Sequence, residues 1–288
     1  MPSISSPVSV EFFPHDSVKE NRFDLPITTK HAKAVQNQGK VYLVGAGTGD
    51  PELLTIKAYK AILKADVICY DNLVSDEILA INPTAEKIYV GKKCAKHSMS
   101  QQDINSLLVT LAQQGKTIVR LKSGDPFIFG RGGEEMQTVI GAGVACESIA
   151  GITTALAVAN SVNIPLTHRD YAQSVKFVTG FLKTDTPNEQ YAELLADNQT
   201  VIFYMGLNTL PSLTQGLLQA GKSADTPFAI ISNVSRENEQ VLIGTLDTIQ
   251  TLQNIAKLPS PAVMIMGEVV SLYNELNASR QYYQQLVV

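Results

Sequence analysis

The residues best suited to chemistry come directly after short apolar runs. Asp71 follows the run DVICY, and the lysines Lys92 and Lys93 follow the run KIYVG. A carboxylate at such a position can take up a proton, and adjacent cations can bind an anionic ligand. Asp71 is therefore a candidate general base, with the capping of a turn as the alternative role.

The longest polar loop of the chain, SGDPFIFGRGGEE, follows the apolar run TIVRLK. Within it, Asp125 precedes a proline and can accept hydrogen bonds from a ligand hydroxyl or ammonium group. Three glycines, Gly130, Gly132 and Gly133, predict an unusually bent backbone around Arg131. The alternative is that Asp125 caps a turn and that Arg131 is solvated.

A glycine-rich turn lies in KVYLVGAGTGDPELL, where an apolar run ends in Gly45, Gly47 and Gly49 before helical spacing resumes. This order predicts a strand, a tight turn and a helix, with a cofactor at the carboxyl end of the strand. Asp50 and Pro51 stand where the dinucleotide fingerprint would place its third glycine. A turn without a ligand is the alternative.

Cationic side chains gather in two places although the net charge of the protein is −4. One group contains Lys92, Lys93, Lys96 and His97, and the other contains His168 and Arg169. Such clusters suit a ligand with several negative charges, because arginine pairs with carboxylates in a forked geometry. Solvation of Lys96 and a structural role for His168 are the alternatives.

The surrounding pattern predicts an α/β protein with two domains and a cofactor in the crevice between them. In residues 39–165, strands alternate with helices, which predicts a mostly parallel, doubly wound sheet. One helix is expected over residues 52–65, and another begins at a Ser100 cap with Asp103 at the third position and ends at Gly115. A small-residue helix over residues 153–160 is expected to pack on this sheet, and a further helix is expected at about 188–197. The segment NIPLTHRDYAQS interrupts the alternation and is interpreted as the domain join. In residues 166–280, two strands flank the short segment around Arg236, so a hairpin and a mixed sheet are expected. Residues 1–38 have no steady periodicity and are predicted to be a mobile tail.

Composition excludes several classes of protein. The chain has 288 residues, of which 44% are hydrophobic and 17% charged, as in soluble globular proteins. The negative net charge argues against a general nucleic-acid binder, and no apolar stretch is long enough to span a membrane. Three separated cysteines suit a reducing cytoplasm and predict no metal site. Neither a P-loop nor a G-x-S-x-G elbow is present.

Several motifs in order resemble one family, the tetrapyrrole methylases, from about Gly39 to about Leu276. They are VGAGTGDPELLT, ADVICYDNLVSDEIL, VGKKCAKHSMSQQDIN, RLKSGDPFIFGRGGEE, GITTALA, NIPLTHRDYAQSV and VIFYMG. The THRDYAQSV segment is similar to that of the members that methylate uroporphyrinogen III. Members that act on later corrinoids, ribosomal RNA or a modified histidine precursor generally lack that segment.

The resemblance implies a homodimer that uses S-adenosylmethionine, releases S-adenosylhomocysteine and methylates uroporphyrinogen III twice to give precorrin-2. Asp71 would be the proton acceptor and Lys92 the proposed proton donor, although binding of a substrate carboxylate suits Lys92 better. Arg131 would serve substrate binding and turnover together with Lys92, Lys93, His168 and Arg169. Cofactor contacts are expected at the glycine turn and at later strand ends, namely Gly45, Gly47, Thr48, Gly49, Asp50, Ser123, Gly124, Asp125, Ile128, Thr153, Thr154, Tyr204 and Met205.

Two positions depart from the family pattern, which usually has proline at Thr48 and glycine at Ser123. Since both replacements are small, an altered local backbone is expected rather than loss of the cofactor. Three alternatives remain: a nicotinamide-dependent oxidoreductase, a tetrapyrrole carrier without activity, and a methylase of the same fold acting on another corrinoid. The first would need Asp66 or Asp71 as its ribose-binding acid, without the rest of that fingerprint.

Overall fold

A computed structural model describes residues 39–91, 99–180 and 191–278, and Asn37–Val288 forms one compact unit. The expected mobile tail, residues 1–38, lies outside the described residues, as do Lys92, Lys93, Lys96 and His97. The helix expected at about 188–197 lies partly outside them. No helix in the described part of the chain is both long and apolar enough to cross a membrane.

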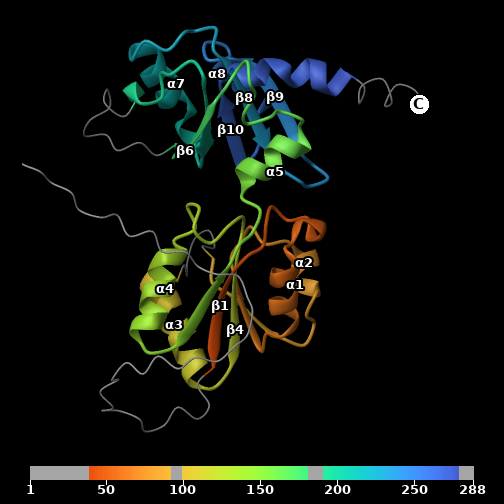
Figure 1. The fold of residues 1–288 in the computed structure, drawn as a ribbon, viewed down its shortest axis with the longest axis vertical. Coiled ribbons are helices and arrows are strands. Elements are labelled where there is room, and N and C mark those ends of the chain that lie inside the picture. The colour runs from red at the N-terminus through yellow and green to blue at the C-terminus, as the bar shows by residue number, and fades with distance from the viewer. Residues whose placement is uncertain (1–38, 92–98, 181–190, 279–288) are drawn as a thin grey trace, which may run out of the picture. The chain divides into compact units, whose positions relative to one another are not determined.

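The first sheet has five strands, all parallel, in the order β3-β2-β4-β1-β5. Its strands are β1 (Lys40–Gly45), β2 (Val67–Tyr70), β3 (Glu86–Tyr89), β4 (Thr117–Lys122) and β5 (Ala145–Ile149). Its helices are α1 (Ile56–Leu63), α2 (Asp76–Ala80), α3 (Gln101–Gln113) and α4 (Gly132–Gly141), with a short 3₁₀ helix, η1 (Pro51–Leu53). The doubly wound prediction is confirmed, with α1 and α2 on one face and α3 and α4 on the other (Figure 1).

Alternation along the strands explains why both faces of this sheet are covered. In β1, Val44 packs with α1 and α2, whereas Leu43 packs with α3 and α4, and both are fully buried. A strand buried on both faces is mostly apolar, as β1 is after Lys40, whereas β4 also buries the charged side chains of Arg120 and Lys122. The predicted start of α3 is confirmed, because Ser100 and Asp103 form a reciprocal capping box.

The second sheet is mixed, as predicted, with the order β6-β7-β10-β8-β9. Its strands are β6 (Ser174–Thr179), β7 (Gln199–Tyr204), β8 (Pro227–Ser232), β9 (Gln240–Thr245) and β10 (Ala262–Met266). Only β6 and β7 pair in parallel, and β8 and β9 form the expected antiparallel hairpin. The remaining elements are α7 (Leu210–Gln219), α8 (Ile249–Ala256) and the 3₁₀ helices η2 (Leu207–Thr209) and η3 (Glu268–Leu272).

Two expectations about helices are corrected. Helix α5 (Thr154–Ser161) was expected to pack on the first sheet, but Ala155 and Val158 pack against Ile265 and its neighbours in the second sheet. Its small residues let it approach either sheet, so local sequence does not decide between them. The helix expected over residues 52–65 is interrupted at residues 54 and 55, and Ile56, which fits its apolar stripe, is 74% exposed.

Candidate functional site

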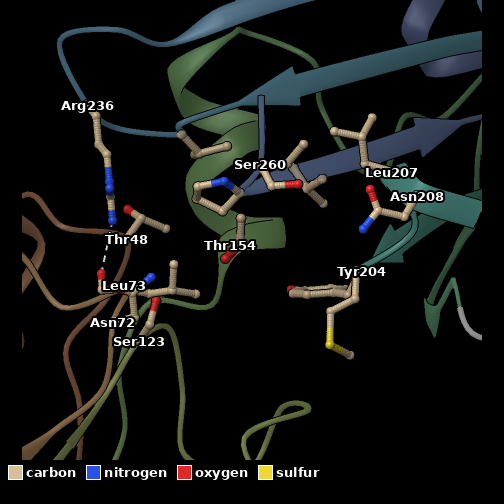
Figure 2. Close-up of a pocket in the computed structure, with 15 residues that line it drawn as sticks. Thr48, Asn72, Leu73, Ser123, Thr154, Tyr204, Leu207, Asn208, Arg236 and Ser260 are labelled. Carbon is tan, nitrogen blue, oxygen red and sulfur yellow. Dashed lines mark hydrogen bonds between the residues drawn. The ribbon is translucent and has the colours of Figure 1, made fainter. Parts of the chain in front are cut away.

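A cavity of about 450 Å³ lies where the strand ends of the first sheet meet loops of the second. Figure 2 shows its lining, which is mostly small, amide or apolar. It is formed by Thr48, Asn72, Leu73, Ser123, Thr154, Tyr204, Met205, Leu207, Asn208, Val234, Arg236, Ser260, Pro261, Ala262 and Val263. Its volume is in the range of small-molecule sites.

The glycine turn supplies Thr48 to this cavity. Gly47 and Gly49 have φ of 66° and 125°, which is left-handed backbone that glycine adopts without strain. The side chain of Thr48, exposed over only 6% of its surface, is held between them, and its Oγ1 has no hydrogen-bond partner among the described residues. A buried hydroxyl without a partner costs free energy. Thr48 is therefore poised for a polar group that the described chain does not supply.

The loop after β4 joins the glycine turn through its backbone. Gly47 and Gly124 exchange two hydrogen bonds, at 3.1 and 2.6 Å, and Ser123 Oγ donates to the Gly47 carbonyl oxygen at 3.4 Å. The Asp125 carboxylate accepts from the amide of Phe127 at 2.9 Å and from that of Gly151 at 3.1 Å. Asp125 therefore caps a turn and ties the ends of β4 and β5 together, while its expected contact with a ligand stays a prediction.

Tyr204 connects the second sheet to the start of α5. Its hydroxyl lies 2.7 Å from Thr153 Oγ1 and accepts from the amide of Ala155 at 2.9 Å. Burial raises the pKa of Tyr204, so it stays neutral and able to donate. The ring of Phe129 lies 5.0 Å from that of Tyr204, between centroids, and Met205 is held at φ 54°. This cluster brings the loop after β4 against the end of β7.

Arg236 lines the cavity, but the sequence alone does not predict that it belongs to a site. It comes from the β8–β9 hairpin, and its Nη2 donates to the carbonyl oxygen of Leu73 at 3.0 Å (Figure 2). A Cβ built on Gly49 would lie 3.4 Å from its Nε, so the guanidinium passes directly over the glycine turn. The sequence indicates only a hairpin turn here, because nothing local relates Arg236 to strand ends more than 160 residues away.

Asp71 lies at the edge of a buried charge cluster. Its carboxylate accepts from the amide of Leu73 at 3.3 Å, and Arg120 Nη2 lies 3.6 Å away. Arg120 also contacts the fully buried Glu135, as does Lys122, at 3.2 and 3.0 Å. Burial lowers the pKa of Lys122. The cluster therefore links Asp71 through Arg120 to the start of α4.

Among the expected substrate cations that the structure describes, Arg131, His168 and Arg169 do not line this cavity. Arg131 has the bent backbone that its glycines predict, at φ 58°, and pairs with Glu134 through two bonds of 2.8 and 2.7 Å. His168 Nδ1 accepts from the amide of Asp170 at 3.2 Å, and its ring contacts Tyr171, while Arg169 is exposed. Lys92 and Lys93 lie outside the described residues. The roles of these residues stay predictions.

Five of the expected cofactor contacts line the cavity: Thr48, Ser123, Thr154, Tyr204 and Met205. Others support the lining instead, since Asp50 caps η1, and Gly45 and Gly124 pack against the backbone of Gly151. Ile128 lies in the loop after β4 and Thr153 contacts the Tyr204 hydroxyl, but neither lines the cavity. In the part of the chain that the structure describes, no group of three or more His, Cys, Asp or Glu residues could hold a metal ion.

The fold and the cavity define a two-sheet α/β protein that binds a small molecule at the carboxyl ends of parallel strands. Residues 40–250 match the family described as Tetrapyrrole (Corrin/Porphyrin) Methylases. The chain belongs to the tetrapyrrole methylase family.

Known relatives are similar over most of this chain. A siroheme synthase from Psychrobacter cryohalolentis is 52% identical over 86% of this chain and 48% of its own length. The chain thus spans about half the length of the curated relatives it matches. The native form of uroporphyrin III C-methyl transferase from Thermus thermophilus is 36% identical, with a TM-score of 0.70 over 81% of this chain and 100% of that one. The same enzyme complexed with S-adenyl homocysteine is 37% identical, with the same TM-score and coverage.

Proposed function

We propose that this protein methylates uroporphyrinogen III on carbon, twice in succession, with S-adenosylmethionine as the methyl donor. The product would be precorrin-2, which serves sirohaem and cobalamin biosynthesis. The observation that carries the proposal is the likeness to the Thermus thermophilus enzyme in complex with S-adenyl homocysteine, at 37% identity over that whole chain. The siroheme synthases among the relatives support the same tetrapyrrole pathway.

The residues of the cavity fit the proposed cofactor. Thr48 offers a buried hydroxyl without a partner, and apolar residues such as Val263 offer a surface for a nucleoside and a methionine chain. Arg236 offers a cation to a carboxylate. The backbones of Gly45 and Gly151 also pack closely against each other, and this contact holds together the strand ends that carry the lining residues. We assign Thr48, Ser123, Thr154, Tyr204 and Met205 as direct contacts, and Gly45, Gly47, Gly49, Asp50, Gly124, Asp125, Ile128 and Thr153 as the shell that shapes them.

When bound, S-adenosylmethionine supplies a methyl group on a sulfonium, which an electron-rich pyrrole carbon takes in line, leaving the electron pair of the broken bond on sulfur. The chain has to hold the two reactants in line, which by itself can lower a barrier substantially. The substrate must then lose a proton, and we propose that Asp71 accepts it. Its carboxylate is oriented for this by the amide of Leu73 and by Arg120.

The eight carboxylates of the substrate require cations around the reacting ring. We propose that Arg131, Lys92, Lys93, His168 and Arg169 bind them. Arg131 would exchange its pairing with Glu134 for a substrate carboxylate, which is feasible because this ion pair is more than half exposed. Lys92 would bind substrate rather than donate a proton, since a lysine ammonium group is a good partner for a carboxylate.

Organisation and location are part of the same proposal. We propose domains at residues 39–165 and 166–280, with α5 of the first domain packing on the sheet of the second. We also propose a cytoplasmic homodimer that needs no metal, nucleic acid or membrane.

The proposal is tested by parallel anaerobic incubations with S-adenosylmethionine and either uroporphyrinogen III or a later corrinoid intermediate. Mass spectrometry follows the methylated product in each. The proposal predicts a methylated product from uroporphyrinogen III. If only the later corrinoid gave a product, the cofactor assignment would stand, and the protein would instead be a methylase of this fold that acts on a later corrinoid.

A further inference from the structure

Arg236 is the only charged side chain among the described residues that line the cavity. None of the lining residues in the described ranges is acidic, so nothing in the lining neutralises its charge. An isolated cation facing a mostly apolar cavity favours an anionic group on the ligand, because a charge that leaves water needs a partner.

The hairpin fixes the backbone that carries Arg236. Asn233 and Ser235 have φ of 52° and 61°, the Arg236 amide donates to the Asn233 carbonyl oxygen at 3.0 Å, and the Ser235 amide donates to the Glu239 carboxylate at 2.8 Å. A tight turn with these bonds has few alternative conformations. The carboxylate of the neighbouring Glu239 accepts its hydrogen bond from the backbone of the turn.

The guanidinium is only partly used by the protein. It donates one bond to the Leu73 carbonyl oxygen, and it makes no ion pair within the ranges that the structure describes. A guanidinium carries five N–H donors in a planar fork, so donors remain for a carboxylate. The bond to Leu73 and the approach to Gly49 place the guanidinium at the glycine turn, which also supplies Thr48, whose hydroxyl has no partner among the described residues (Figure 2).

We propose that Arg236 binds a carboxylate of the ligand in this cavity, and so contributes to recognition beyond the residues of the family motifs. This inference rests on the proposed function, which offers two sources of a carboxylate. One is the methionine part of S-adenosylmethionine, and the other is a side chain of the tetrapyrrole. The bond to Leu73 means that the same contact would also steady the loop that carries Asp71.

The test is calorimetric binding of S-adenosylhomocysteine and of its decarboxylated analogue, which keeps the nucleoside, thioether and amine. The full chain is compared with Arg236→Gln, Arg236→Lys and the control Glu237→Gln, an exposed residue of the same hairpin outside the cavity lining. The KM for uroporphyrinogen III is measured for the same four proteins.

If the cofactor supplies the carboxylate, Arg236→Gln should weaken S-adenosylhomocysteine about ten- to a hundred-fold and leave the decarboxylated analogue within about two-fold. If the tetrapyrrole supplies it, cofactor affinity should hold and the KM for uroporphyrinogen III should rise about ten-fold or more. Arg236→Lys should fall between Arg236→Gln and the original chain, because it keeps the charge and loses the fork. The Glu237→Gln control should match the original chain.

Two results would overturn the inference. One is an equal loss of affinity for S-adenosylhomocysteine and for its decarboxylated analogue, with no change in the KM for uroporphyrinogen III. Loss of a purely structural hydrogen bond to Leu73 would give that result. The other is no change in any of the three quantities. Failure of the unsubstituted chain to bind S-adenosylhomocysteine would overturn the proposed function and this inference together, so the two failures are distinguishable.

Discussion

At the residue scale, Asp71 is the side chain on which the proposed proton transfer depends. Asp71→Asn keeps the acceptor for the Leu73 amide and removes the base, so kcat should fall about 100-fold or more. Affinity for S-adenosylhomocysteine should stay within about two-fold, measured by calorimetry on the same samples. Asp76→Asn, at an exposed acid in the first turn of α2, is the control. An unchanged kcat in Asp71→Asn would remove Asp71 from the mechanism.

Glu135 is the residue whose loss should affect stability most. It is fully buried and its Oε1 accepts from Arg120, Lys122 and Gln101. Glu135→Gln would leave the buried Lys122 without a counter-charge and Arg120 with only Asp71, at 3.6 Å, which should cost about 3–5 kcal/mol of unfolding free energy. Urea titration measures it, with the exposed Glu134→Gln as the control. A loss below about 1 kcal/mol would show that the cluster is not a true buried ion network.

Residues also mark the limit of what the sequence could predict. The glycine turn and the bent backbone at Arg131 are local features, so their letters predict them, and both are confirmed. Glu135 is visible in the motif GRGGEE, but its pairing with Arg120 depends on how α4 lies against β4. Arg236 has no local signal, because its partner Leu73 is on another sheet. Long-range contacts of this kind require the folded chain.

At the element scale, the ends of β1, β4 and β5 meet through glycine. A Cβ on Gly151 would lie 2.2 Å from the Gly124 carbonyl oxygen, so Gly151→Ala should separate these strand ends. We expect unfolding at a lower temperature and weaker S-adenosylhomocysteine binding, measured by thermal denaturation and calorimetry.

Helix α4 provides the matched control for that substitution. Nothing lies within 4 Å of a Cβ built on Gly133, and its φ is not left-handed. Gly133→Ala should therefore leave stability unchanged or raise it by up to about 1 kcal/mol, because alanine favours the helix. If both substitutions had the same effect, the close approach at Gly151 would not be what supports the site.

Strands β1 and β5 are also joined by an ion pair whose pH dependence can be worked out. Hydrogen bonds from Lys40 and then Lys57 lower the pKa of Glu147 to about 2. Since the folded pKa is depressed, the stabilisation is complete above the unfolded value of about 4.3 and is lost as pH falls toward 2. The side chain is 31% exposed, so solvent screening limits the effect to about 1 kcal/mol.

The measurement is urea unfolding of the original chain and Glu147→Gln at several pH values. The difference in stability should be constant at pH 5 to 7 and shrink progressively below pH 4.3. Exposed Glu86→Gln, which loses a single partner, Lys116, is the comparison. A difference that grew as the pH fell would contradict the assignment.

Helices and strands could be predicted from the sequence where the spacing of their apolar residues is regular. Buried strands and the Ser100 capping box follow from the sequence, and the sheet types are confirmed. The partner of α5 did not follow, because a helix of small residues packs closely on any apolar face. Strand order depends on the crossovers, and no local pattern specifies it.

At the scale of the whole molecule, the family of the chain is established, whereas its reaction is our proposal. The tetrapyrrole methylase match covers residues 40–250, and the chain spans about half the length of the siroheme synthases it resembles. The match to the family leaves the reaction itself to be tested on this chain.

The central claim is the double methylation of uroporphyrinogen III. The most direct test is to count S-adenosylhomocysteine formed per uroporphyrinogen III consumed, anaerobically and with excess methyl donor, while weighing the tetrapyrrole product by mass spectrometry. The account predicts two equivalents of S-adenosylhomocysteine and a product heavier by two methyl groups. A single equivalent at exhaustion of the substrate, or cofactor binding with no methylated product, would contradict it.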